Sequence, residues 1–238
     1  MTKPQLFLLH FAGGNCYSFN FLLPYLKEFD VVTIELPGRG RRIMEDLLKD
    51  FDSAALDVYR QIRARVGPGP FIIYGHSMGA HVGLRVANLL RRSGYSPSYL
   101  VVSGNAGPSD KKKKYTYLLG KRDFISHLKK LGGISSEVIE NDELFSVFEP
   151  ILRADFELVE KSEMAGEPPL DIPIYAIMGT GESRSTEIAN WANYTYTHFD
   201  YEILAGDHFF IHKHPGRIAA IVKDCYTRAT ATAPVARY

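Results

Sequence analysis

Cysteine is scarce in this sequence, and neither a long apolar run nor an excess of one charge is present. The two cysteines, Cys16 and Cys225, lie far apart and lack the close spacing of metal ligands. We therefore expect free thiols, a reducing compartment and no metal site. No apolar run approaches membrane-spanning length, which predicts a soluble, cytoplasmic protein. Lys and Arg number 28 against 27 Asp and Glu, so the overall charge favours neither nucleic acid nor a membrane as a partner.

Apolar residues make up 45% of the 238-residue chain, which is enough to bury a substantial core. Short β-rich runs, most of them bounded by Gly or Pro, alternate with helical patterns. This alternation predicts an α/β fold with a mostly parallel sheet covered by helices on both faces. The expected strands are residues 6–10, 31–36, 71–75, 99–104, 172–179 and 201–204.

Residues 110–168 interrupt this alternation, because they are charged, helical in pattern and without a convincing strand. We interpret them as a helical insertion in a single domain that spans residues 1–238, with Lys111 to Lys114 as its solvated entrance. Elsewhere the helical pattern is clearest after Asp52 or Ser53, either of which suits an N-cap. The apolar positions that follow are spaced three or four apart, at Leu56, Tyr59, Ile62 and Val66.

The stretch Phe71 to Gly83, FIIYGHSMGAHVG, joins an apolar strand to a helical pattern through Gly-His-Ser-Met-Gly. In a Gly-x-Ser-x-Gly turn the small flanking residues allow a strained backbone that projects the hydroxyl above the sheet, beside a helix N-terminus. The five-residue pattern alone is weak, and its alternative is an ordinary turn. The strand before it and the helix after it favour Ser77 as a nucleophile.

A serine nucleophile needs a histidine base, which follows late in the chain if the order is serine, acid, histidine. His208 lies in LAGDHFFIH, just after the last expected strand, and is our candidate base. The other histidines are less suited. His212 and His214 lead into the last helix, His76 is enclosed in the turn, and His10 and His81 are expected to pack in the interior.

The acid that orients the histidine is expected in a loop at the carboxyl end of a strand. Glu182 is the first carboxylate after the strand IPIYAIMG, and we predict that it is this acid. An ordinary loop glutamate is the alternative. The rival carboxylates are Asp207, Asp200 and Glu187, of which Asp207 adjoins His208 and is expected to point away from the ring.

Two backbone amides are expected to bind the oxyanion that forms during acyl transfer. The amide of Met78 follows the nucleophile directly. The loop HFAGGN after the first strand should supply the second donor, for which we choose Ala12, with Phe11 as the next candidate. A plain Gly-Gly turn is the alternative reading of this loop.

In combination, these segments resemble the type II thioesterases, the stand-alone editing hydrolases of nonribosomal peptide and polyketide synthesis. The resemblance covers nearly the whole chain, and a generic lipase would share only the serine turn. Ser77 and His208 match the family's nucleophile and base, whereas Glu182 stands where the family usually has aspartate. The segments that carry the resemblance are LLHFAGGN, ELPGRGRR, GHSMGA, DFISHLKKLGG, ILRADFELVE, PIYAIMG and GDHFFIH.

The resemblance implies an α/β-hydrolase fold in which the insertion forms a helical lid. It also implies hydrolysis of acyl thioesters from the phosphopantetheine arm of acyl or peptidyl carrier proteins. The arm enters as part of the substrate, and no cofactor of the protein's own is expected. We expect a monomer. Apolar residues of the lid either line the acyl pocket or pack between its helices: Phe124, Leu128, Leu131, Phe145 and Phe148.

Other functions share the same serine turn. A small-molecule esterase and a product-releasing or cyclising thioesterase would carry the same three residues, and a silent binding module could retain the fold. Carrier domains are acidic around the arm by the resemblance, so basic residues near the site are candidates for docking. These are Arg39, Arg41 and Arg42, and Lys111 to Lys114, with solvated surface as the alternative for both groups.

Overall fold

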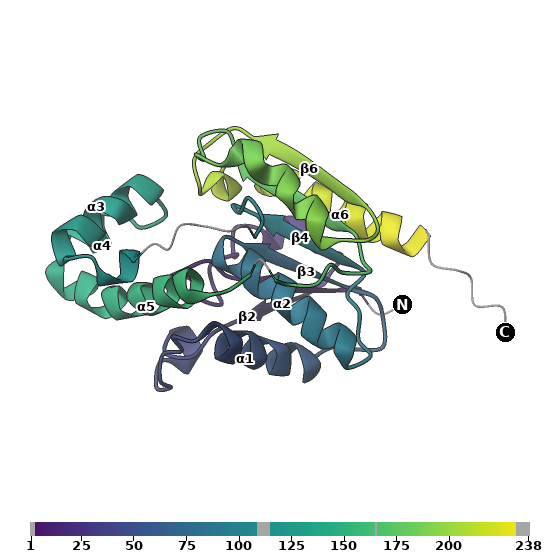
Figure 1. The fold of residues 1–238 in the computed structure, drawn as a ribbon, viewed down its shortest axis with the longest axis horizontal. Coiled ribbons are helices and arrows are strands. Elements are labelled where there is room, and N and C mark those ends of the chain that lie inside the picture. The colour runs from purple at the N-terminus through teal and green to yellow at the C-terminus, as the bar shows by residue number, and fades with distance from the viewer. Residues whose placement is uncertain (1–2, 109–114, 165, 232–238) are drawn as a thin grey trace.

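The computed structural model describes residues 3–108, 115–164 and 166–231. At its centre is a six-stranded sheet in the order β2-β1-β3-β4-β5-β6, with every pair of neighbours parallel (Figure 1). The strands are β1 (Gln5–Leu9), β2 (Asp30–Ile34), β3 (Phe71–His76), β4 (Tyr99–Ser103), β5 (Ile174–Gly179) and β6 (Phe199–Leu204). The α-helices are α1 (Phe51–Arg63), α2 (Met78–Arg92), α3 (Lys121–Leu131), α4 (Ser136–Glu140), α5 (Asp142–Lys161) and α6 (Pro215–Ala231). All six expected strands are present, with bounds shifted by at most two residues.

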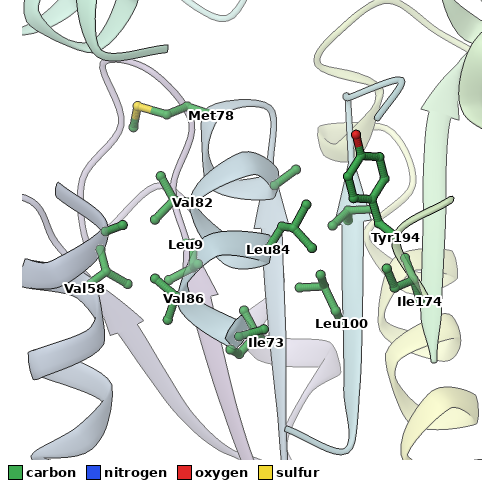
Figure 2. Packing of buried hydrophobic residues seen from close by; sticks show 14 of the residues in the cluster. Leu9, Val58, Ile73, Met78, Val82, Leu84, Val86, Leu100, Ile174 and Tyr194 are labelled. Atoms are coloured by element: carbon green, nitrogen blue, oxygen red, sulfur yellow. The ribbon is translucent and has the colours of Figure 1, made fainter. Parts of the chain in front are cut away.

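Side chains that alternate along each strand build two separate cores, as the period of a strand requires. On β1, Phe7 and Leu9 join a cluster with α1 and α2, whereas Leu6 and Leu8 join a cluster with α6. Figure 2 shows the first cluster, where Val58 of α1 and Val82 of α2 lie near strand side chains. The prediction of a parallel sheet with helices on both faces is confirmed.

The register places the loops that follow the central strands at one edge of the sheet. Leu9 at the end of β1 lies opposite both Ile34 of β2 and Gly75 of β3. Because the three strands run parallel and end at nearly the same level, the segments after them meet above one edge. These segments contain Ala12 after β1, Ser77 after β3 and, after β2, the loop with Arg39, Arg41 and Arg42, which we call the arginine loop.

Helix α1 begins earlier than its pattern indicated. Its N-cap is Asp50, whose side chain accepts a hydrogen bond from Ser53 N at 2.8 Å, so the prediction of Asp52 or Ser53 as the N-cap is wrong. Its buried face is set by Phe51, Ala54, Ala55, Val58 and Ile62, and Leu56 is exposed. The two alanines explain the error, because small residues let α1 approach α2 closely without adding to an obvious apolar stripe.

The segment between β4 and β5 contains a short 3₁₀ helix, η3 (Thr116–Leu118), and helices α3, α4 and α5. We call these four helices the helical insertion. Figure 1 shows α3, α4 and most of α5 extending beyond the sheet on one side. Phe124, Leu128, Phe145 and Leu152 form a separate apolar cluster with Phe148 against it, so these residues pack between insertion helices. Leu131 is half-buried, and Lys111 to Lys114 lie outside the described residues.

Cys16 and Cys225 are buried and form no disulfide. Within the described ranges, no helix combines the length and apolar character needed to cross a membrane.

Candidate active site

Ser77 is placed by the sharp turn between β3 and α2. Its φ of 56° and ψ of −110° make it the only non-glycine residue with a positive φ in the described part of the chain. Its amide donates to Ser103 O at 2.7 Å, and Asn105 Nδ2 donates to its carbonyl at 3.3 Å. A Cβ at Gly79 would overlap the Leu9 carbonyl oxygen, so glycine is required where α2 meets β1. The turn thus has the backbone strain that the sequence motif predicts.

His208 reaches Ser77 from the loop after β6. The two atoms that meet are His208 Nε2 and Ser77 Oγ, 3.0 Å apart. Phe209 and Phe210 anchor this loop: Phe210 is fully buried, and the Phe209 ring packs edge-on against Phe11 at 4.9 Å. The imidazole is therefore held in position to take the serine proton.

Glu182 orients the other side of the imidazole. Its Oε2 accepts from His208 Nδ1 at 2.8 Å, and its Oε1 accepts from Gly179 N, at the end of β5, at 2.9 Å. Only 9% of the Glu182 side chain and 13% of the His208 side chain are exposed, so water screens this contact little. A proton on Nδ1 leaves Nε2 as the acceptor for the Ser77 hydroxyl.

The rival carboxylates are engaged elsewhere. Asp207 accepts from Phe209 N and pairs with Lys213, pointing away from the ring as expected. Asp200 pairs with Arg228 on the far side of β6, and Glu187 pairs with Arg184. Among these carboxylates, only Glu182 contacts His208.

The loop after β1 holds the second expected oxyanion donor. The carbonyl of Phe11, in the peptide that carries the Ala12 amide, accepts from Gly14 N at 2.9 Å and from His10 Nδ1 at 2.8 Å. Met78 is the first residue of α2, where helix amides have no acceptor within the helix. Burial, aided by the nearby Arg39, lowers the pKa of His10 to about 4, so this ring is neutral.

A second neutral histidine, His76, lies next to the His208 ring. His76 is fully buried, its Nδ1 is 2.8 Å from Ser103 Oγ, and its ring centroid is 5.1 Å from that of His208. Burial first, and then the proximity of His208, holds the pKa of His76 well below its usual range. An uncharged His76 adds no positive charge beside His208 that would oppose its protonation.

The arginine loop differs from its expected role. Arg39 is buried and forms a bidentate ion pair with Asp155 of α5, while Arg42 binds Glu45 and Asp57. Only Arg41 of the three is exposed, and it lies over the Tyr17 ring at 5.6 Å. Docking by Arg39 is therefore ruled out by its burial. Arg42 is partly exposed, but its charge is already paired with Glu45 and Asp57.

Comparison with known proteins places this arrangement in a family. The sequence model of the thioesterase domain family matches residues 4–226 of this chain. The gramicidin S biosynthesis protein GrsT of Aneurinibacillus migulanus is 32% identical over 219 residues, which cover 89% of this chain and 84% of the relative.

Solved structures agree in both fold and sequence. The type II thioesterase BorB from the borrelidin biosynthetic cluster superposes with a TM-score of 0.86 at 30% identity, covering 94% of this chain and 93% of that one. ClbQ from the colibactin pathway reaches a TM-score of 0.89 at 25% identity, covering 97% and 99%. These matches confirm the α/β-hydrolase fold and the resemblance to type II thioesterases. The chain therefore belongs to the thioesterase family and is a thioester hydrolase.

Proposed function

We propose that Ser77, His208 and Glu182 form a catalytic triad that hydrolyses acyl or aminoacyl thioesters from the phosphopantetheine arm of carrier proteins. The observation that carries the proposal is the unbroken chain of hydrogen bonds from Ser77 Oγ through the imidazole to Glu182. A strained serine turn, a buried acid and a base held between them is the arrangement that serine acyl transfer needs.

The reaction would proceed in two steps, acylation of Ser77 and hydrolysis of the acyl-enzyme. His208 Nε2 takes the Ser77 proton as Oγ bonds to the thioester carbonyl carbon, and the carbonyl oxygen becomes an oxyanion facing the Met78 and Ala12 amides. The C–S bond then breaks, and the thiol leaves with the proton from His208. Water repeats these steps on the acyl-enzyme, releasing the acid and restoring Ser77. Glu182 stabilises the imidazolium in both steps and is itself never protonated.

The substrate class follows from the relatives. One is named for gramicidin S biosynthesis, and the two structures come from the borrelidin and colibactin pathways, the latter a nonribosomal peptide and polyketide pathway. Their names support a role in such a pathway for this chain, with a carrier protein as partner and removal of unwanted acyl groups as the task. The phosphopantetheine arm would enter with the substrate.

Two contacts of the helical insertion support the expectation that it acts as a lid. The loop between α3 and α4 packs so tightly on Phe209 that a Cβ at Gly133 would overlap its ring. From the opposite side, Asp155 of α5 accepts from the Gly13 amide at 2.7 Å. The insertion therefore contacts both the loop after β6 that carries His208, which we call the base loop, and the loop after β1 that carries Ala12 and Gly13, which we call the oxyanion loop.

A substrate panel tests the proposed function. The same acyl group would be presented in three substrates: as a thioester of a carrier protein, as a thioester of N-acetylcysteamine and as an ethyl ester. The proposal expects kcat/KM to be highest for the carrier-bound thioester and lowest for the ester, with free acid as the product. Preference for the ester would identify a small-molecule esterase, and a cyclic product would identify a product-releasing thioesterase. Either outcome would overturn the editing role.

A further inference from the structure

Asp155 is the most deeply buried carboxylate that contacts the loops around Ser77, and it comes from the helical insertion. Its side chain has no exposed surface, and that of Arg39 is 3% exposed. Oδ2 accepts from Arg39 Nη1 at 2.6 Å and Oδ1 from Arg39 Nη2 at 2.8 Å. A buried ion pair of this kind is tolerated only when both charges and their hydrogen bonds are satisfied. Among the residues that the structure describes, Asp155 has one further hydrogen-bond partner, which lies in the oxyanion loop.

That partner is the amide of Gly13, which donates to Asp155 Oδ2 at 2.7 Å. Gly13 has a φ of +76°, and a Cβ on it would lie 2.5 Å from Leu152 Cδ2, one helical turn before Asp155. The positive φ favours glycine at this position, and the contact with Leu152 shows that the oxyanion loop lies directly against α5. A charge-assisted hydrogen bond to a fully buried carboxylate is among the stronger contacts available to a backbone amide.

The two peptide units that flank Ala12 are both held. In the unit before it, the Phe11 carbonyl accepts from Gly14 N and His10 Nδ1. Because a trans peptide points its C=O and N–H in opposite directions, this contact also fixes the direction of the Ala12 N–H. In the unit after it, the Gly13 N–H is held by Asp155. Rotation of the peptide that carries the Ala12 N–H would break the contacts of the Phe11 carbonyl. Displacement of the peptide after Ala12 would break the contact with Asp155 and shift Ala12 with it.

We propose that Asp155, itself held by Arg39, is a positioning residue for the Ala12 oxyanion donor. The proposal rests on the proposed function, which gives Ala12 this role. It makes α5 part of the catalytic apparatus, so that the site is complete only while the insertion is docked on the loop after β1. An insertion displaced from that loop releases Gly13 and misplaces the oxyanion donor.

Two double variants isolate the contact with Gly13. Arg39→Met/Asp155→Asn and Arg39→Met/Asp155→Leu both remove the buried charges, so neither leaves one charge unpaired. Asn and Leu are similar in size, but only the Asn side chain keeps an oxygen that can accept from Gly13 N. Hydrolysis of an acyl N-acetylcysteamine thioester avoids any effect of carrier docking. Active sites are counted by the endpoint of fluorophosphonate labelling, so that kcat refers to folded enzyme.

The proposal expects kcat of the Leu-containing variant to be about 10- to 100-fold below that of the Asn-containing one, because loss of a whole oxyanion donor costs about 10²–10³-fold. KM should agree within about 2-fold, because the contact acts on the transition state. Equal kcat values would overturn the proposal, and so would a loss confined to KM. Glu149→Gln, which removes the ion pair with Arg153 on the same helix without touching the oxyanion loop, is the control and should retain wild-type kcat.

Amide exchange in the wild-type protein gives an independent test if the double variants do not fold. The Gly13 amide should exchange with solvent at least ~100-fold more slowly than in an unfolded chain. Exchange at the unfolded rate would overturn the proposal. Failure of the proposed function is recognised separately, because Ser77→Ala would then keep its activity whatever the Asp155 variants do.

Discussion

Ser77 is held in a strained backbone conformation by contacts on both of its peptide groups. Its amide is tied to Ser103 and its carbonyl to Asn105, both of which belong to β4 or directly follow it. Strain of this kind persists only where the surroundings hold it, and it is concentrated at functional sites. The same turn points Oγ at His208 Nε2, so the backbone strain and the direction of the hydroxyl have one structural cause.

Glu182→Gln should lower kcat by as much as ~10⁴-fold while the protein remains folded. An amide cannot stabilise the imidazolium, and its NH₂ group favours the wrong tautomer of His208, as in other triads where the acid was replaced by its amide. Steady-state hydrolysis of an acyl thioester measures the effect. Asp207→Asn is the matched control, because that neighbouring carboxylate faces Phe209 N and Lys213. Similar losses in both variants would remove Glu182 from the triad.

At the scale of elements, the structure depends on the close approach of α2 to β1 at Gly79. A Cβ there would overlap backbone atoms of Leu9, which a strand in the middle of the sheet cannot move aside. The turn that carries Ser77 and the helix that carries the Met78 amide are thereby fixed to the central strands.

Gly79→Ala should destabilise the fold by about 3 kcal/mol, the upper end for overpacking a rigid interior. Urea denaturation followed by fluorescence measures the free energy of unfolding. Gly69→Ala provides the control, since no atom lies within 4 Å of the position its Cβ would take. If Gly79→Ala were as stable as the control, the close approach would not be a requirement of the fold.

The sequence predicted the elements that follow from local patterns. Each β-rich run became a strand, and the Gly-x-Ser-x-Gly pattern predicted the strained turn at Ser77 because its signal lies within a few residues. The contact between Glu182 and His208 could be predicted because parallel strands place the loops at their carboxyl ends together. The pair of Arg39 and Asp155 could not be found in this way, since 116 residues separate them and each resembles a solvated surface charge. Leu56 was misplaced because alanines, which carry little apolar signal, form the buried face of α1.

At the scale of the whole molecule, two buried neutral histidines link stability to pH. Burial lowers the pKa of His10 most and Arg39 lowers it further, whereas Asp155, the hydrogen bond to Phe11 and Glu35 raise it, and the result is about 4 against an ordinary 6.5. Between these pH values the unfolded chain binds the proton and the folded chain does not. The free energy of unfolding therefore falls as pH falls from 6.5 towards 4.

His10→Asn should make this pH dependence shallower. For wild-type protein the His10 contribution lost between pH 6.5 and 5 is on the order of 2 kcal/mol, because one pKa unit corresponds to about 1.4 kcal/mol. His76, whose pKa is also depressed, adds a slope of the same sign in both proteins. The measurement is therefore the difference in slope between wild type and variant in urea denaturation at pH 7, 6 and 5. Parallel curves would show that His10 takes up its proton normally in the folded state.

The central claim is that Ser77 carries the acyl group during thioester hydrolysis, and a quenched reaction examined by mass spectrometry tests it most directly. Wild-type protein mixed with an acyl thioester should show the mass of one acyl group on the peptide that contains Ser77. Ser77→Ala should show no such adduct, and its turnover should fall by ~10⁴-fold or more. Near-wild-type turnover in Ser77→Ala, or an acyl group on another residue, would contradict the account.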